Sequence, residues 1–79
     1  MPVTLTLNGG VLTLTDNNGN AATGRNVEVY NVAGICLARS SWQTGQKQTT
    51  VTIPVSAGSV LIVRVSDGTH QFLERILNH

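Results

Sequence analysis

The chain is short of charge, of cysteine and of helix-forming residues, and each shortage excludes a class of protein. Only 11% of its residues are charged and the formal net charge is +1, so no basic field exists to hold a nucleic-acid backbone. The same near-neutrality argues against a partner selected by charge, whether acidic or a membrane surface. The single cysteine, Cys36, excludes an internal disulfide. We interpret it as a small apolar strand residue, with a reactive or intermolecular thiol as the alternative.

Long apolar runs are also missing. No stretch approaches the run of about 18 apolar residues that indicates a membrane-spanning helix, so we expect no membrane insertion. Met1-Pro2 leads directly into alternating Thr and Val, without the basic and apolar segments of a signal peptide. The chain is expected to form one domain, residues 1–79. A single core of this size rarely supplies more than ~3–5 kcal/mol of net stability.

The residues that dominate instead are Thr, Val, Asn and Gly, which suit short strands and tight turns. Six turn-like glycines recur at intervals of 10 to 15 residues, close to the spacing in a sandwich or barrel: Gly9, Gly19, Gly34, Gly45, Gly58 and Gly68. The sequence therefore predicts an all-β fold, a seven-stranded Ig-like antiparallel β-sandwich, with strands at Val3–Leu7, Val11–Thr15, Val27–Val32, Ile35–Trp42, Gln48–Val55, Val60–Val65 and Thr69–Leu77. Pro54 cannot donate a ladder hydrogen bond, so its strand should end there or lie at a sheet edge.

Alternation of apolar and polar residues indicates which faces are buried. In the third strand, Val27 and Val29 are expected on one face, with Glu28 and Tyr30 on the other. The polar stretch Asp16–Arg25 predicts an exposed loop.

The strongest strand and turn signals lie in the second half of the chain. Val60–Val65 is nearly continuously apolar, which predicts a central strand that is mostly covered on both faces. Gly58 is expected in the turn before it at positive φ, and Asp67-Gly68 after it indicates a type I′ hairpin. The apolar residues of Thr69–Leu77 fit a helical stripe as well as a strand. We choose strand, because the hairpin pairs this segment with the run before it.

No catalytic or cofactor-binding constellation is evident. Asp67, His70 and Glu74 could in principle gather a metal, but structural zinc sites take several Cys and His ligands and this trio offers one imidazole. Asp16–Asn20 resembles the start of a calcium loop, yet it lacks the glycine at position six and the glutamate at position twelve. No phosphate-binding glycine loop occurs. We therefore expect no enzyme activity, no metal and no cofactor, and interpret these residues as surface positions.

Two motifs occur in a specific order in the second half of the chain. The first is VEVYNVAG (residues 27–34), the second is SAGSVLIVRVSDG (residues 56–68), and FLERIL (residues 72–77) follows as an apolar strand with a basic residue. This order resembles the type A C-terminal sorting domain of the type IX secretion system, found on secreted cargo of Bacteroidetes. The resemblance covers about two-thirds of the chain. The chain departs from the family at Leu61, where tyrosine is common, and at Asn78-His79, where the family usually has lysine.

The resemblance implies a function and a set of recognition residues. It implies that the domain directs a larger precursor from the periplasm across the outer membrane to the cell surface or medium. The implied partners are the type IX outer-membrane translocon and a sortase-like peptidase, which usually removes the domain. The implied recognition residues are Gly34, Gly58, Val63, Arg64, Val65, Gly68, Phe72, Glu74, Arg75, Ile76 and Leu77.

Within this set, we expect the final segment, Thr69–His79, to be the element that the machinery contacts. Glu74 and Arg75 are expected to point outward, and loss of Leu77–His79 is expected to leave most of the sandwich folded. An exposed final strand could also pair with a second copy of the chain, or exchange into it.

An alternative function depends on three aromatic residues. Tyr30, Trp42 and Phe72 could form a stacking platform for sugars, or they could be core and half-buried packing residues, which is the more frequent role. The first interpretation would make the chain an Ig-like adhesion or carbohydrate-binding module of a cell-surface protein, which also uses the polar loops.

Overall fold

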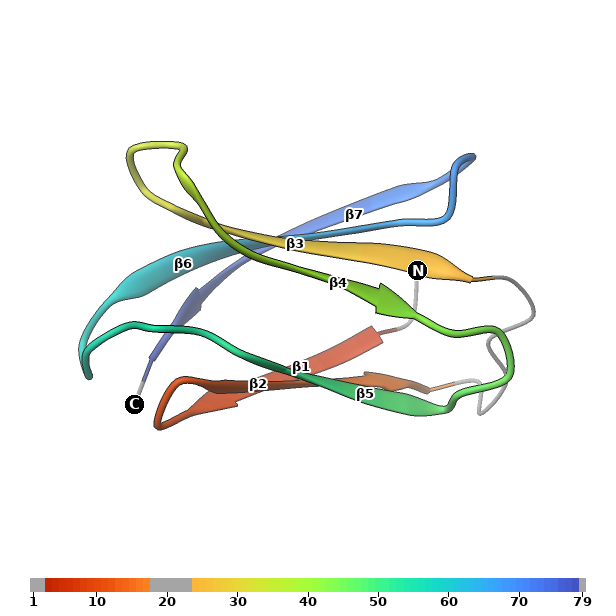
Figure 1. Cartoon of the computed structure of the whole chain (residues 1–79), viewed down its shortest axis with the longest axis horizontal. Helices are drawn as coiled ribbons and strands as arrows, with labels where there is room; N and C mark the ends of the chain where they lie inside the picture. Colours follow the sequence, from red (N-terminus) through yellow and green to blue (C-terminus); the bar gives the residue numbers. More distant parts are fainter. Residues whose placement is uncertain (1–2, 18–23, 79) are drawn as a thin grey trace.

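The computed structural model describes residues 3–17 and 24–78 (Figure 1). Within these residues the chain is all-β, as the sequence predicts. The strands are β1 (Val3–Asn8), β2 (Val11–Asp16), β3 (Arg25–Asn31), β4 (Cys36–Trp42), β5 (Gln48–Thr52), β6 (Val60–Ser66) and β7 (Gln71–Leu77). The last segment is a strand, as chosen, and β5 ends two residues before Pro54. The described part of the chain contains no helix that is long and apolar enough to cross a membrane.

The strands form two antiparallel sheets that pack as a sandwich. One sheet has the order β1-β2-β5 and the other has the order β4-β3-β6-β7. Figure 1 shows the sheets as two layers, and β4 lies close to β5. β6 pairs with both β3 and β7 and is central, as predicted. The sheet edges are therefore β1, β5, β4 and β7.

The core lies between the sheets and consists of alternate residues of the strands. In β3, Val27 and Val29 are buried, whereas Glu28 and Tyr30 are half-buried, so the predicted alternation is confirmed. The same period of two runs through β6. The buried apolar side chains are Val3, Leu7, Leu12, Leu14, Val27, Val29, Trp42, Val51, Ile53, Leu61, Val63 and Val65.

The prediction about the coverage of β6 agrees with the structure, and the prediction about Asp16–Arg25 is wrong. The residues of β6 that face the other sheet are buried and those on its outer face are half-buried, so both faces are mostly covered. The sequence predicts an exposed loop from Asp16 to Arg25, but Asp16 belongs to β2 and Arg25 belongs to β3. The side chain of Asp16 is 2% exposed. Arg25 Nη2 donates to Asp16 Oδ2 at 2.5 Å, and the guanidinium lies 4.7 Å from the centre of the Trp42 ring. This ion pair joins the two sheets; residues 18–23, the rest of the predicted loop, lie outside the described residues.

The turns follow the predicted glycines. Five of the six have positive φ, including Gly58 at 88°, and Gly19 lies outside the described residues. Gly10, the second glycine of the β1–β2 turn, has a φ of 79°, and a Cβ there would lie 2.7 Å from the carbonyl oxygen of Ile53. Ile53 N–H donates to the carbonyl of Gly10 at 2.7 Å. Glycine is therefore required where the β1–β2 hairpin approaches the chain after β5.

The β6–β7 turn differs from the predicted type. Asp67 N–H donates to the carbonyl of His70 at 3.1 Å, so the central pair is Gly68-Thr69. No non-glycine residue in the described part of the chain has positive φ, whereas a type I′ turn needs it at both central positions. Gly68 at the first central position fits a type II′ turn instead. Asp67 Oδ1 accepts the backbone N–H groups of His70 and Thr69, and these bonds hold the pKa of Asp67 below its usual range.

Candidate recognition surface

One face of the four-stranded sheet points away from the core and carries side chains from all four strands. Directly paired residues of antiparallel strands share a face, so the register identifies the members of this set. This outer face comprises Asn26, Glu28 and Tyr30 of β3, Cys36, Arg39 and Ser41 of β4, Val60, Ile62, Arg64 and Ser66 of β6, and Gln71, Leu73, Arg75 and Leu77 of β7. It divides into a polar, a charged and an apolar zone.

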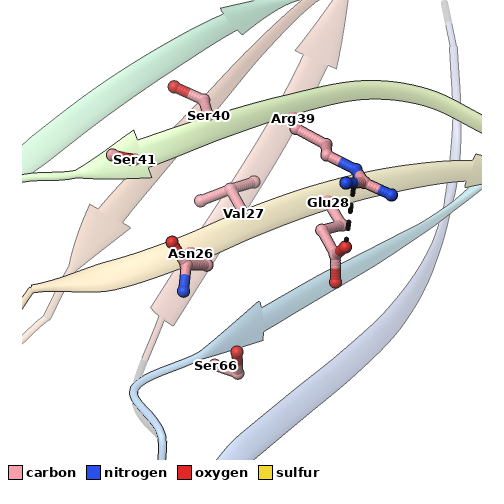
Figure 2. Close-up of a pocket in the computed structure, with 7 residues that line it drawn as sticks. All are labelled: Asn26, Val27, Glu28, Arg39, Ser40, Ser41 and Ser66. Atoms are coloured by element: carbon pink, nitrogen blue, oxygen red, sulfur yellow. Dashed lines mark ion pairs between the residues drawn. The ribbon is translucent and has the colours of Figure 1, made fainter.

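The polar zone lies at the end of β6 that leads into the β6–β7 turn. Asn26, Ser41 and Ser66 form one row across β4, β3 and β6. With Glu28 and Arg39 they border a shallow hollow of about 410 Å³ (Figure 2). Amide, hydroxyl and charged groups dominate the hollow, so it offers hydrogen bonds rather than apolar area.

The charged zone is the next row, and it is basic overall. Glu28 pairs with Arg64 (Oε1 to Nη1, 3.0 Å) and more loosely with Arg39 (Oε2 to Nε, 3.7 Å). Arg39 Nε also donates to the sulfur of Cys36 at 3.4 Å, which raises the pKa of Arg39. Arg75 forms no ion pair within residues 3–17 and 24–78. One carboxylate therefore faces two guanidinium groups in this row, and Arg75 lies one row further along the same face. The outer face as a whole keeps an excess of positive charge.

The apolar zone follows β7 and extends to the opposite end of the sheet. Leu73 and Leu77 flank Arg75 on the same side of the strand and are 56% and 44% exposed. At the end of the sheet near Leu77, the β3–β4 turn carries Val32 and Ile35, which are 70% and 59% exposed. Four large apolar side chains are therefore exposed in this part of the molecule, two on β7 and two on the β3–β4 turn.

The first sequence motif forms β3 and the turn after it. Asn31 Oδ1 accepts the N–H groups of Ala33 and Ile35, both at 3.0 Å, and Gly34 N–H donates to the carbonyl of Asn31. Gly34 has a φ of 86°, which this turn requires. The asparagine and glycine of the motif thus build a rigid turn that leaves Val32 and Ile35 in solvent.

The second motif begins with a turn that is held by Asn78, whose side chain is almost fully buried. Asn78 Oδ1 accepts Gly10 N–H at 3.0 Å, and Nδ2 donates to the carbonyl of Ser56 at 2.8 Å. The backbone of Asn78 adds two bonds at 2.8 Å, one to the carbonyl of Ser59 and one from Gly58 N–H. Four hydrogen bonds therefore join the end of β7 to the β1–β2 hairpin and to the turn before β6.

The residues implied by the resemblance do not share one surface. Arg64, Arg75 and Leu77 lie on the outer face. Val63 and Val65 are fully buried in the core, so a partner that binds the folded domain does not reach them.

The other predicted residues of β7 point to the inner side of the sheet. Phe72, Glu74 and Ile76 pair with three buried residues of β6. Phe72 and Ile76 pack against the core, whereas Glu74 is exposed. Glu74 and Arg75 are both exposed, as predicted, but they lie on opposite sides of β7, because successive residues of a strand face opposite sides.

The three predicted glycines are turn residues rather than contact residues. Gly34 and Gly58 lie at the end of the sandwich where β7 ends, and Gly68 lies at the other end (Figure 1). Sequence reasoning missed Leu73 and Asn78 as site residues. The period of two along β7 was sufficient to find Leu73, but a lone asparagine after an apolar strand carries no signal of its burial.

The aromatic residues do not form one platform. Trp42 is 1% exposed and its Nε1 donates to the carbonyl of Gln46 at 2.8 Å. Phe72 packs against the core, and Tyr30 is half-buried on the outer face. The interpretation of these residues as core and half-buried packing is confirmed.

Metal-binding side chains do not cluster in the part of the chain that the structure describes. No three His, Cys, Asp or Glu side chains gather there to hold a metal ion, although His70 Nδ1 and Asp67 Oδ2 approach to 3.6 Å. No protein-family model matches the chain, and no curated protein matches it. The assignment of function therefore rests on the sequence motifs and on the outer face.

Proposed function

We propose that this chain is a sorting domain of the type IX kind. In this proposal it directs an attached precursor from the periplasm through the outer membrane to the cell surface, where a sortase-like peptidase removes it. The translocon binds the part of the outer face formed by β6 and β7, with Arg64, Leu73, Arg75 and Leu77 as contacts. No catalytic role is assigned to the domain.

The observation that carries the proposal is the spatial relation of the two motifs. The strands that contain them, β3 and β6, are direct neighbours paired from Asn26–Ser66 to Asn31–Leu61. The turn after β3 and the turn before β6 therefore lie at the same end of the sandwich. The two motifs are separate in sequence but lie side by side in the folded domain, with their turns at the same end. A partner that recognises the folded domain can therefore contact both.

The chemistry of the proposed contact surface supports the same conclusion. Leu73 and Leu77 supply apolar area to a partner, and Arg75 between them supplies a directional cation that no described carboxylate neutralises. Leucine alone would bind non-specifically, whereas an arginine between apolar residues fixes the orientation of a partner. The rigid sheet holds all three side chains on one side.

The test is a transfer of function to an unrelated protein. Residues 1–79 are fused to the end of a folded reporter that carries an export signal. The fusion is expressed in a Bacteroidetes strain with an active type IX system and in a matched strain whose system is inactivated. We expect surface exposure of the reporter, measured by antibody labelling of intact cells, in the first strain only. Retention in the periplasm of both strains, or exposure in both, contradicts the proposal.

A further inference from the structure

The two sheets have unequal numbers of strands, and the difference falls on the side where β1 and β7 are edges. On the other side β4 lies close to β5, so both sheets end together there. Four strands therefore face three, and β7 has no strand of the other sheet directly opposite it.

The burial of β7 agrees with this arrangement. The residues of β6 that pair with Phe72, Glu74 and Ile76 are at most 1% exposed, but Phe72 and Ile76 are only half-buried and Glu74 is exposed. Between β1 and β7 runs a groove of about 390 Å³, lined by Leu5, Thr6, Leu7, Asn8, Ile76 and Leu77. The groove exposes the edge of β1 next to Ile76, and the incomplete burial of Phe72 and Glu74 shows that the inner side of β7 stays accessible beyond it.

The edge strand β1 is also the one that lacks protection against pairing. It is uncharged, and its register with β2 runs without a bulge over all six residues. The other edges carry protective features: Arg39 and a bulge at β4, Pro54 just after β5, and Glu74 and Arg75 on β7. An unprotected edge presents free backbone N–H and C=O groups to an added strand.

We propose that this groove binds an extended segment of a partner protein, which adds to β1 as an eighth strand. The bound segment has the pattern apolar-x-basic-x-apolar. Its alternate side chains point under β7, where the two apolar residues cover Phe72 and Ile76 and the lysine or arginine between them faces Glu74. Such strand addition derives affinity from backbone hydrogen bonds and specificity from alternate side chains.

Glu74 decides the chemistry of the segment. It stands between two apolar residues on the inner side of β7 and has no ion-pair partner among the described residues. A purely apolar strand would remove water from this carboxylate without replacing its hydrogen bonds, which is unfavourable. A second copy of β1 is such a strand, because its inward residues are Val3, Leu5 and Leu7. The partner is therefore a different, basic segment.

The experiment compares two fluorescein-labelled peptides, SVTKTLS and SVTETLS, by fluorescence anisotropy with the whole chain. We expect the lysine peptide to bind about tenfold more tightly than the glutamate peptide. In Glu74→Lys the preference reverses. The matched control, Thr50→Lys with Thr52→Lys, makes the same change of net charge on exposed residues of β5 and keeps the preference of the wild type. Amide chemical shifts in NMR spectra should change along β1 and β7 and stay constant along β4.

Four results overturn the proposal. Three come from the peptide experiment: equal affinity for the two peptides, no binding of either up to about 1 mM, and shift changes confined to β4 and β5. The fourth comes from sedimentation of the chain without peptide, where a dimer whose interface maps to β1 would assign the groove to a second copy. Reporter sorting is not used in this experiment, so its outcome is independent of the proposed function.

Discussion

Substitution of Asn78 by alanine should remove a large share of the stability of this domain. The Asn78 side chain accepts Gly10 N–H and donates to the carbonyl of Ser56, and its environment excludes water. Alanine makes neither bond and leaves the buried Gly10 N–H without its partner.

The magnitude follows from these two losses. The bond to Ser56 is worth about 1 kcal/mol, because Ser56 is exposed and water replaces the donor. The unpaired N–H of the buried Gly10 costs about 1–3 kcal/mol. The sum, about 2–4 kcal/mol, compares with the ~3–5 kcal/mol of net stability available to a domain of this size. Removal of Leu77–His79 would delete the same residue, so the expectation that such a truncation leaves most of the sandwich folded is revised.

Urea unfolding followed by tryptophan fluorescence measures the effect, because Trp42 is buried in the core. Two variants provide controls. Asn8→Ala removes an exposed asparagine from β1 and should change the free energy of unfolding by less than about 0.5 kcal/mol. Asn78→Asp keeps the acceptor for Gly10 but sets a carboxylate against the carbonyl of Ser56, so it should be more stable below the carboxyl pKa than at neutral pH. A loss below about 0.5 kcal/mol in Asn78→Ala would refute the role assigned to this residue.

Three further predictions concern the turns and the buried ion pair. Asp67→Ala should lower the melting temperature more than Asp67→Asn, because the amide oxygen still accepts the two backbone N–H groups and loses only the contribution of the negative charge. The folded pKa of Asp67 lies below its usual range, so this contribution to stability is complete above about pH 4 and is lost as pH falls through the folded pKa. A ¹³C NMR titration of the Asp67 carboxyl group measures that pKa. Gly10→Ala should lower the melting temperature more than Gly34→Ala. Both variants replace a positive-φ glycine, but only the Cβ at position 10 meets a carbonyl oxygen at 2.7 Å. Equal decreases in melting temperature would contradict this. Arg25→Met should lower the free energy of unfolding by about 1.5–3 kcal/mol by removing the cation beside buried Asp16, and Arg25→Met with Asp16→Leu should recover part of that loss in the same urea assay.

The strands were predictable because their signals are local. Thr and Val in period two define half-buried strands, and turn glycines separate them, so all seven elements follow from short windows of sequence. The residue pairs that tie distant segments together were not predictable in the same way. Asp16 and Arg25 look like a polar loop in sequence, and only the packing of the two sheets buries them as an ion pair.

The recognition residues were only partly predictable for a similar reason. Arg64 and Arg75 are exposed to partners because the register puts them on the outer face, whereas Val63 and Val65 alternate into the core. Glu74 would have been placed correctly from the period of two alone. Asn78 could not have been, because its partners come from segments that precede it by about 20 and 70 residues and no local pattern connects them.

The most direct measurement of the proposed sorting function compares two variants of the reporter fusion. The first, Leu73→Ser with Arg75→Gln, changes one exposed leucine and one charge on the outer face of β7. The second, Val11→Ser with Thr50→Glu, makes the same kinds of change on exposed residues of the three-stranded sheet. Both must melt within a few degrees of the wild type. The proposal predicts that the first fusion accumulates in the periplasm while the second reaches the cell surface, and equal surface exposure of the two fusions would contradict it.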